Sequence, residues 1–406
     1  MKQELDRLMK EKEIDAIIID GFTSYDPNVF YFLQVPHLGG LIIKKRDEEP
    51  ILVHGLMERD EARKTGLRLV EITQYEYHKI TARQKDAFKA WAELVGTIFK
   101  DHGVQGRLCY YGQRSVSAGY YYVKALTRQV PNIQIVREPA KTIMQQTRET
   151  KEDSEVARIK SNAERTEAAV GDLVKFFKSH TVHNNHLVKD DGSPATIGDA
   201  KHFLTHALLG RGLVEISGSI LSIGRDAGVP HSTGNDQDRL ELGKTIILDV
   251  FPRELAGGYY YDFTRTFVLG KAPAEVIDAY KTVADGQQML IDSFKVDART
   301  RSYETKLCKM FERRGHPTPL STPGTKQGYI HSLGHGLGLE VHEKPTFSLA
   351  KTNKDFIQAR SLFTVEPGLY YPDKGYGVRL EDVVYINQDG AVENLSRYPK
   401  ELVIEI

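Results

Sequence analysis

Four acidic residues interrupt apolar segments that otherwise have the pattern of buried β-strands: Asp249, Asp262, Glu366 and Glu381. In the segment 259–269, strand alternation puts Asp262 and Thr264 on one face and Phe263 and Phe267 on the other. A solvated sheet face would explain one such residue. Four carboxylates gathered on polar faces would repel one another, and a pair of divalent metal ions is the most economical compensation. The sequence therefore predicts a β-rich metal site.

A histidine-rich segment supplies further metal-ligating side chains. Three histidines lie within twelve residues, next to glycines that permit close backbone approaches: His331, His335 and His342. The segment does not satisfy a G-x-G-x-x-G motif because Leu339 takes the last glycine position, so a dinucleotide site is rejected. A second group of histidines, in a polar segment that we predict to be a surface loop, has no acidic partners of this kind: His180, His183 and His186.

Composition narrows the class of protein. Lys plus Arg and Asp plus Glu each number 55 in 406 residues, so the formal net charge is zero; this argues against nonspecific nucleic-acid binding. Only two cysteines occur, which favours a reducing compartment over a disulfide scaffold. The charged N-terminus lacks a signal peptide, and no apolar run approaches the ~18 residues of a membrane span. We expect a soluble cytoplasmic protein without a membrane partner.

Two domains are predicted, 1–145 and 146–406. Alternating strands and helices indicate an α/β first domain, with strands expected at 16–19, 40–43, 50–53 and 133–136 and a helix at 85–99. A capping box at Thr150–Asp153 begins a long amphipathic helix that opens the second domain. That domain is expected to be α+β with antiparallel pairing, with strands at 244–251, 259–269, 362–366 and 377–386 and helices at 274–294 and 302–314.

Several separated motifs, in order along the chain, resemble those of the pita-bread metallopeptidases, in particular the Xaa-Pro dipeptidases (prolidases) and Xaa-Pro aminopeptidases. They are Pro230-His231-Ser-Thr-Gly-Asn, Ile247-Leu-Asp249, Tyr261-Asp262-Phe-Thr-Arg-Thr-Phe, the segment from His331 to Glu343, Val365-Glu366-Pro-Gly and Val378-Arg379-Leu-Glu381-Asp. The resemblance covers most of the chain and implies a creatinase-like N-terminal domain followed by a pita-bread catalytic domain.

The resemblance also implies a metal site and a reaction. Its five ligands correspond to Asp249, Asp262, His335, Glu366 and Glu381. Oxygen-rich ligation suits two manganese ions, with cobalt or zinc as alternatives. The implied reaction is dinuclear metal-dependent hydrolysis of the peptide bond that precedes proline.

Roles for the remaining residues follow from the same resemblance. Glu366 would act as the proton acceptor, and His231 and His342 would contact the substrate and stabilise the tetrahedral intermediate. His331 would line the pocket for proline. Arg379 and Thr264 would hold ligand carboxylates by hydrogen bonds.

Several alternatives remain open on the sequence. A dipeptidase is favoured over an aminopeptidase P that acts on longer peptides, although the two share every motif. Methionine aminopeptidases lack the N-terminal domain, and metal-free binding modules or creatinase on this fold would be expected to lack ligands that are intact here. The segment between Asp249 and Asp262 is about two residues longer than usual, in a turn where insertions are tolerated. The resemblance also implies a homodimer.

Overall fold

The computed structural model describes residues 3–406, which form two compact units. One unit runs to Thr147 and includes Ala256–Gly258, and the other comprises Arg148–Leu255 and Tyr259–Ile406. Each unit has its own sheets and its own apolar core. Within residues 3–406, no helix is both long enough and apolar enough to cross a lipid bilayer.

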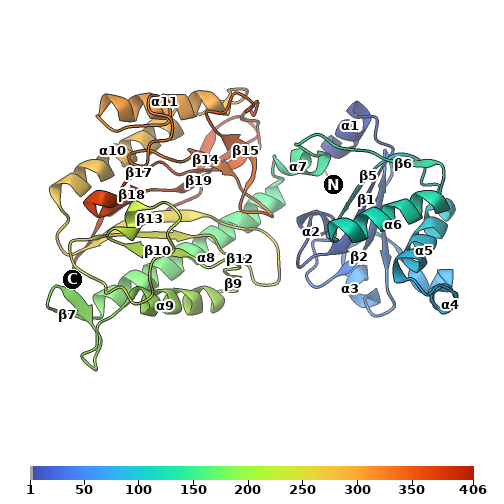
Figure 1. The fold of residues 1–406 in the computed structure, drawn as a ribbon, viewed down its shortest axis with the longest axis horizontal. Helices are drawn as coiled ribbons and strands as arrows, with labels where there is room; N and C mark the ends of the chain where they lie inside the picture. Colours follow the sequence, from blue (N-terminus) through green and yellow to red (C-terminus); the bar gives the residue numbers. More distant parts are fainter. Residues whose placement is uncertain (1–2) are drawn as a thin grey trace. The chain divides into compact units, whose positions relative to one another are not determined.

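The first unit is an α/β layer structure (Figure 1). Its six-stranded sheet has the order β4-β3-β2-β1-β5-β6, with the bounds Arg68–Glu71, Ile51–His54, Gly39–Lys45, Ala16–Phe22, Gly106–Gly112 and Ile133–Ile135. Alternate residues of β1 face two different cores: Ile18 packs with α5 (Ala87–Asp101) and α6 (Val116–Gln129), and Ile17 packs with α1 (Gln3–Glu11) and α2 (Pro27–Leu33). The predicted α/β class is confirmed; β4, β5 and α6 were not predicted.

The second unit begins with α8 (Asp153–Lys178), the long helix expected from the apolar period. Its capping box is formed by Glu152 and Glu155, so the predicted box at Thr150–Asp153 is wrong by two residues. Thr150 instead forms an isolated β-bridge with Ser361, which holds the chain extended just before the helix.

Strands at the centre of the second unit lie between two pairs of helices (Figure 1). A four-stranded sheet has the order β10-β11-β13-β21 (Ile220–Ile223, Thr245–Val250, Phe263–Leu269, Val403–Ile404), and a five-stranded sheet has the order β15-β14-β16-β19-β20 (Glu343–Phe347, Gly334–Gly336, Leu362–Val365, Asp382–Ile386, Val392–Asn394). Helices α8 and α9 (Ile197–Leu209) lie on one side, and α10 (Ala274–Ile291) and α11 (Thr300–Arg313) lie on the other. The expected α+β class with antiparallel pairing is confirmed.

The predicted strand at 377–386 is in fact two strands. β18 (Tyr376–Arg379) pairs with β17 (Gly368–Tyr371), whereas β19 pairs with β16, so the chain changes partner at Leu380 and Glu381. The second histidine group was also described wrongly as a loop. His183 and His186 pair across a short hairpin of β7 (Thr181–His183) and β8 (His186–Val188), and His186 is buried.

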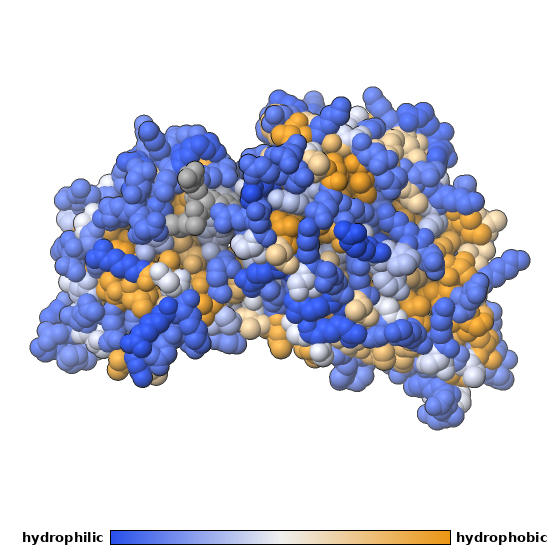
Figure 2. Space-filling view, turned by 180° about the vertical axis from the view of Figure 1, so that it is seen from behind, coloured by the Kyte–Doolittle hydropathy of each residue, from blue (hydrophilic) through white to orange (hydrophobic). Residues whose placement is uncertain are grey.

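Apolar side chains of the second unit concentrate between α10, α11 and the five-stranded sheet. Phe294, Phe347 and Phe363 form edge-to-face and tilted ring contacts there. Hydrophilic residues cover most of the molecular face drawn in Figure 2, and hydrophobic residues form separate patches on it. This core fixes the strands whose ends carry the acidic residues.

Candidate metal centre

Three of the four acidic residues lie at strand ends and not within strands as predicted. Asp262 immediately precedes β13, Glu366 immediately follows β16, and Glu381 lies between β18 and β19; only Asp249 is inside its strand, β11. At a strand end the backbone leaves its ladder and can bond elsewhere. The Glu381 N–H donates to the Thr264 carbonyl at 3.1 Å and so joins the two sheets at this point.

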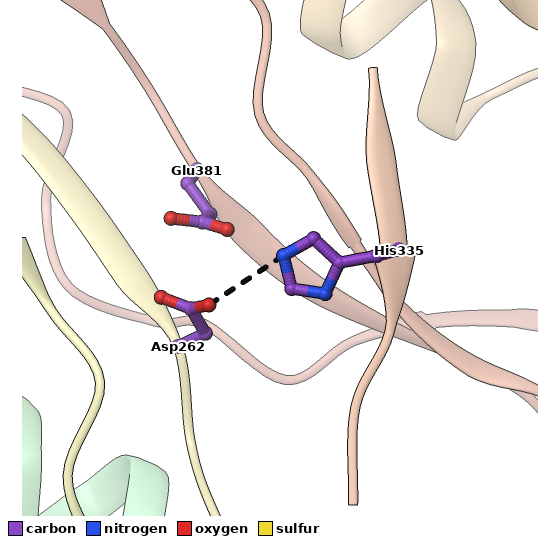
Figure 3. Close-up of side chains that lie close together, drawn as sticks. All are labelled: Asp262, His335 and Glu381. Atoms are coloured by element: carbon purple, nitrogen blue, oxygen red, sulfur yellow. Dashed lines mark ion pairs between the residues drawn. The ribbon is translucent and has the colours of Figure 1, made fainter. Parts of the chain in front are cut away.

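The strand ends bring a cluster of ligand atoms together (Figure 3). Side-chain ligand atoms of Asp262, His335 and Glu381 all lie within 4.8 Å of one another, and the three side chains point toward a common centre. His335 Nε2 is 3.7 Å from Asp262 Oδ2 and 3.5 Å from Glu366 Oε1. Four of the five expected ligands are therefore adjacent.

Asp249, the fifth expected ligand, interacts electrostatically with the other acids and is hydrogen-bonded to Arg379. Its charge helps to raise the pKa of Glu381, Asp262 and Glu366, after burial as the largest cause in each case. Its Oδ2 accepts a hydrogen bond from an Arg379 N–H at 2.7 Å. The longer turn between Asp249 and Asp262 has not displaced the strand register, because Asp249 pairs with Thr264 across β11 and β13.

The protein alone does not balance the acidic charge of this centre. Burial and neighbouring carboxylates raise the pKa of Asp262 and of Glu366 well above their usual range, and that of Glu381 to about 8. Burial, followed by the charge of His342, lowers the pKa of His335 to about 4, so His335 does not act as the counter-charge. Raised carboxyl pKa values of this kind indicate a place where a nearby cation would stabilise the ionised forms.

Two oxygen atoms support the fit of a divalent ion more directly. Asp249 Oδ1 and Asp262 Oδ1 are buried and accept no hydrogen bond from any part of the chain that the structure describes. Buried carboxylate oxygens normally have partners, because an unsatisfied one costs about 1–3 kcal/mol. A centre of carboxylate oxygens with one imidazole suits a hard or borderline divalent cation, so these residues fit a metal site.

The imidazole is already oriented for ligation. His335 Nδ1 is 3.0 Å from the Gly336 carbonyl, which requires Nδ1 to carry the proton and leaves the Nε2 lone pair facing the acids. Gly334 and Gly336, on either side, allow this close packing. A Cβ at either position would lie 2.0 Å from a backbone carbonyl oxygen of a neighbouring strand.

Arg379 and Thr264 lie beside two different carboxylates. Besides its bond to Asp249, Arg379 donates from Nε to Thr264 Oγ1 at 3.2 Å. The Thr264 hydroxyl, 0% exposed, donates in turn to Glu381 Oε2 at 2.8 Å. These contacts form a continuous chain of hydrogen bonds from one acid to the other.

His331 has both ring nitrogens engaged by the protein. Its Nδ1 is 2.7 Å from the Ser332 carbonyl, and its Nε2 is 2.8 Å from the Tyr370 hydroxyl. Arg379 donates to that same hydroxyl at 2.8 Å, so Tyr370 donates its own proton to His331. His331 is therefore a neutral tautomer with the proton on Nδ1, and only its ring faces remain for other contacts. No sequence pattern indicated Tyr370, whose role arises from the pairing of β17 with β18.

The other two predicted histidines are exposed beside the centre. The ring of His342 lies 4.4 Å from that of His335, between centroids. His231 is near enough for its charge to lower the pKa of His342 and of His331, although burial is the larger cause for both. The carbonyl of Pro230, next to His231, accepts a hydrogen bond from Arg379 at 3.2 Å. The structure thus groups all three histidines around the acids.

Two buried glutamates that the sequence did not single out hold the histidine segment. Glu304 of α11 accepts a hydrogen bond from the Leu333 N–H at 2.7 Å, and the Leu333 carbonyl accepts one from the Glu366 N–H at 2.8 Å. Glu343 accepts from the Leu339 N–H at 3.0 Å and pairs with Lys151 at 2.9 Å. Glu343 belongs to the histidine motif and was a findable candidate; Glu304 has no distinguishing local pattern.

Comparison with known proteins gives a consistent result. The family description "Metallopeptidase family M24" matches residues 157–388. A putative dipeptidase of Bacillus subtilis is 28% identical, with 94% of each chain covered, and a Xaa-Pro dipeptidase of Pyrococcus furiosus is 25% identical, with 99% of this chain and 100% of the relative covered. The crystal structure of an X-Pro aminopeptidase from Thermotoga maritima is similar in fold, with a TM-score of 0.76 over 100% of both chains at 20% identity.

Proposed function

Because the chain belongs to metallopeptidase family M24 and is a peptidase, we propose that it hydrolyses the bond preceding proline, as a Xaa-Pro dipeptidase. The observation that carries the proposal is the cluster of Asp262, His335 and Glu381, together with the unsatisfied Oδ1 atoms of Asp262 and of Asp249. The Pyrococcus furiosus relative named as a Xaa-Pro dipeptidase, matched over nearly the whole chain, supports the substrate class.

Two divalent ions would be held by Asp249, Asp262, His335, Glu366 and Glu381, and we propose manganese as the native metal. Bound there, such ions supply Lewis-acid activation of water and of the scissile carbonyl at neutral pH. The oxygen-rich donor set supports a hard ion, with cobalt and zinc as alternatives.

Within this proposal, Glu366 moves the proton. Its carboxylate lies between His335 and His331, at 3.5 Å and 3.9 Å respectively. This position beside the other ligands suits a group that accepts a proton from the attacking water and delivers it to the proline nitrogen.

The histidines would position the substrate. His231 and His342 are exposed beside the acids and are suited to donate hydrogen bonds to the scissile carbonyl as it gains charge. The ring face of His331, whose nitrogens are both occupied, offers an apolar wall to a proline ring. Arg379 and Thr264 would keep the carboxylates of Asp249 and Glu381 oriented.

The second candidate is a Xaa-Pro aminopeptidase that takes longer peptides, because the Thermotoga maritima structure of that name has the same fold. Hydrolysis of Ala-Pro and Ala-Pro-Ala by chelator-treated protein, with and without manganese, separates the two. Metal-dependent cleavage of the dipeptide alone supports the proposal. Cleavage of the tripeptide assigns an aminopeptidase, and cleavage of neither by metal-loaded protein removes the proline-specific assignment.

Two variants test the roles of the residues in the same assay. Glu366→Ala should abolish hydrolysis while thermal unfolding shows an intact fold, and near-normal turnover would overturn the proton-transfer role. His231→Ala should retain metal, measured by elemental analysis, and lose rate. Loss of metal in that variant would make His231 a ligand instead of a substrate contact.

We also propose a cytoplasmic homodimer. Both cysteines, Cys109 and Cys308, are buried free thiols, which supports a reducing compartment. The dimer follows from the family resemblance, and light scattering on the purified chain tests it directly.

A further inference from the structure

The first unit contains a cavity beside β1, where the strand order of its sheet reverses. From β1 the chain builds β2, β3 and β4 toward one edge, then returns to the other side of β1 to add β5 in parallel. In open α/β sheets such a point leaves a crevice outside the carboxyl ends of the strands, where ligands bind. The end of β1 and the residue after β5 meet there.

The cavity has a volume of about 390 Å³, within the range of roughly 300–1,000 Å³ that small-molecule sites occupy. Its lining contains two acidic residues, three aromatic residues and no Lys or Arg: Asp20, Gly21, Phe22, Tyr25, Asp26, Gly40, Trp91 and Gln113. This composition disfavours an anionic ligand.

Asp20 has one occupied and one unoccupied oxygen. Its Oδ2 accepts hydrogen bonds from Trp91 Nε1 at 3.1 Å and from the Tyr110 hydroxyl at 3.3 Å, and it also binds Arg114. No residue between 3 and 406 donates a hydrogen bond to Oδ1. Three donors hold one oxygen of this cavity-lining carboxylate in place, and the other oxygen remains available as an acceptor.

Aromatic residues line the same cavity as Asp20. Tyr25 is 75% exposed and Phe22 47% exposed, although both are large side chains that normally gain from burial. Phe22 covers Gly39, where a Cβ would lie 2.3 Å from the phenyl ring, so the absence of a side chain at Gly39 lets the ring lie there. Aromatic faces next to a carboxylate attract cations.

We propose that this cavity binds an organic cation, an ammonium group on a short apolar stem. The ammonium would donate to Asp20 Oδ1 and lie against the rings of Trp91 and Tyr25. Asp26 adds a second carboxylate to the lining. The inference depends only on the first unit and is independent of the peptidase function.

Trp91 makes the proposal directly testable, because it is the chain's single tryptophan and part of the cavity wall. Full-length protein is titrated with n-butylammonium, followed by tryptophan emission and by the single indole N–H resonance. n-Butanol serves as the neutral probe of matched size and butyrate as the anionic one. We expect a saturable response to n-butylammonium, with the other two binding about 10-fold more weakly or not at all.

Variants distinguish this cavity from general surface binding. Tyr25→Ala should weaken n-butylammonium binding about 3- to 10-fold, and Tyr120→Ala, an exposed tyrosine outside the cavity, should leave it unchanged. Asp20→Asn should remove the response. Since Asp20 also holds Trp91 and Arg114, the Tyr25 variant decides the case if Asp20→Asn does not fold. No saturable response, equal binding of n-butanol, or equal weakening by both tyrosine variants would overturn the proposal.

Discussion

Glu381 and Asp382 are neighbours in sequence, are both buried, and lie in opposite electrostatic surroundings. Asp382, 0% exposed, forms ion pairs with Arg265 at 3.0 Å and Lys400 at 2.6 Å. Glu381, 2% exposed, accepts a hydrogen bond from Thr264, and the charges that act on it come from Asp249 and Asp382 and, in the opposite sense, from Arg379. The two side chains mark two regions, an ion-paired cluster around Asp382 and the acidic centre around Glu381.

The difference shows where the chain provides its own cations. Arg265 is fully buried and also donates to the carbonyls of Thr264 and Glu381, so it holds the strand junction from the ion-paired side. A buried carboxylate with such partners can remain ionised within the protein alone. On the acidic side, Arg379 is the guanidinium within residues 3–406 that is set against the four acids. The acidic centre is therefore suited to bind an added cation.

The largest expected effect comes from breaking the ion-paired side. Asp382→Asn removes the negative charge that pairs with Arg265 and Lys400. Removal of one partner of a buried ion pair lowers the free energy of unfolding by about 3–5 kcal/mol. Urea unfolding measures this loss. Asp389→Asn, an exposed carboxylate in the turn that follows β19, is the matched control and should change stability by less than about 0.5 kcal/mol. Equal effects of the two variants would show that Asp382 is not an essential counter-ion.

The same substitution on the acidic side should act in the opposite sense on stability. Asp262→Asn removes a buried charge from among like charges, so chelator-treated protein should be at least as stable as the parent. Metal content and hydrolysis should fall about 100-fold or more. Loss of a residue that only supports a metal ligand costs about 10- to 100-fold, and loss of the ligand itself should cost at least as much. Elemental analysis and unfolding of the metal-free protein test both halves. A metal-free variant less stable than the parent would contradict the comparison.

The division between the two regions was only partly visible in the sequence. The four acids can be found in the sequence because each interrupts an apolar segment, and such a segment is recognised from neighbouring residues alone. Their grouping into one ligand set came from the family resemblance. That Asp382 would face cations while Glu381 faces acids depends on the break between β18 and β19.

Other parts of the site required tertiary structure altogether. The hydrogen bonds of Arg379 and Tyr370 cross between strands that are close only because β17 pairs with β18. Glu304 looks like any polar position of an amphipathic helix until α11 is packed against the histidine segment. Long-range pairing of this kind leaves no local signal, so sequence patterns found the acids and missed what orients them.

A smaller effect should separate hydrogen bonding from charge at Glu304. Glu304→Ala leaves the buried Leu333 N–H without its acceptor and frees the peptide that also holds Glu366, so kcat should fall about 10-fold at saturating metal. Glu304→Gln retains an acceptor oxygen and should restore most of the rate. Glu312→Ala, on the same helix but bonded to Thr318, is the control and should be near normal. If Gln fails as fully as Ala, the charge and not the hydrogen bond is what the centre requires.

The smallest effect tests burial without crowding, at Glu215, whose pKa shift has no cause from a charged neighbour among residues 3–406. Burial raises the pKa of Glu215 to about 7, against an opposing hydrogen bond from Thr205. The unfolded chain releases this proton near 4.5, whereas the folded protein keeps it to about 7, so stability falls as pH rises through that window. Glu215→Gln should therefore gain about 1 kcal/mol at pH 8 after allowance for partial exposure, and nothing at pH 4. Unfolding at the two pH values measures the gain. An equal gain in stability at pH 4 and pH 8 would show that burial of the Glu215 charge is not the cause. Burial alone would then not account for the raised pKa values of the acidic centre, and the crowding of its four carboxylates would be needed.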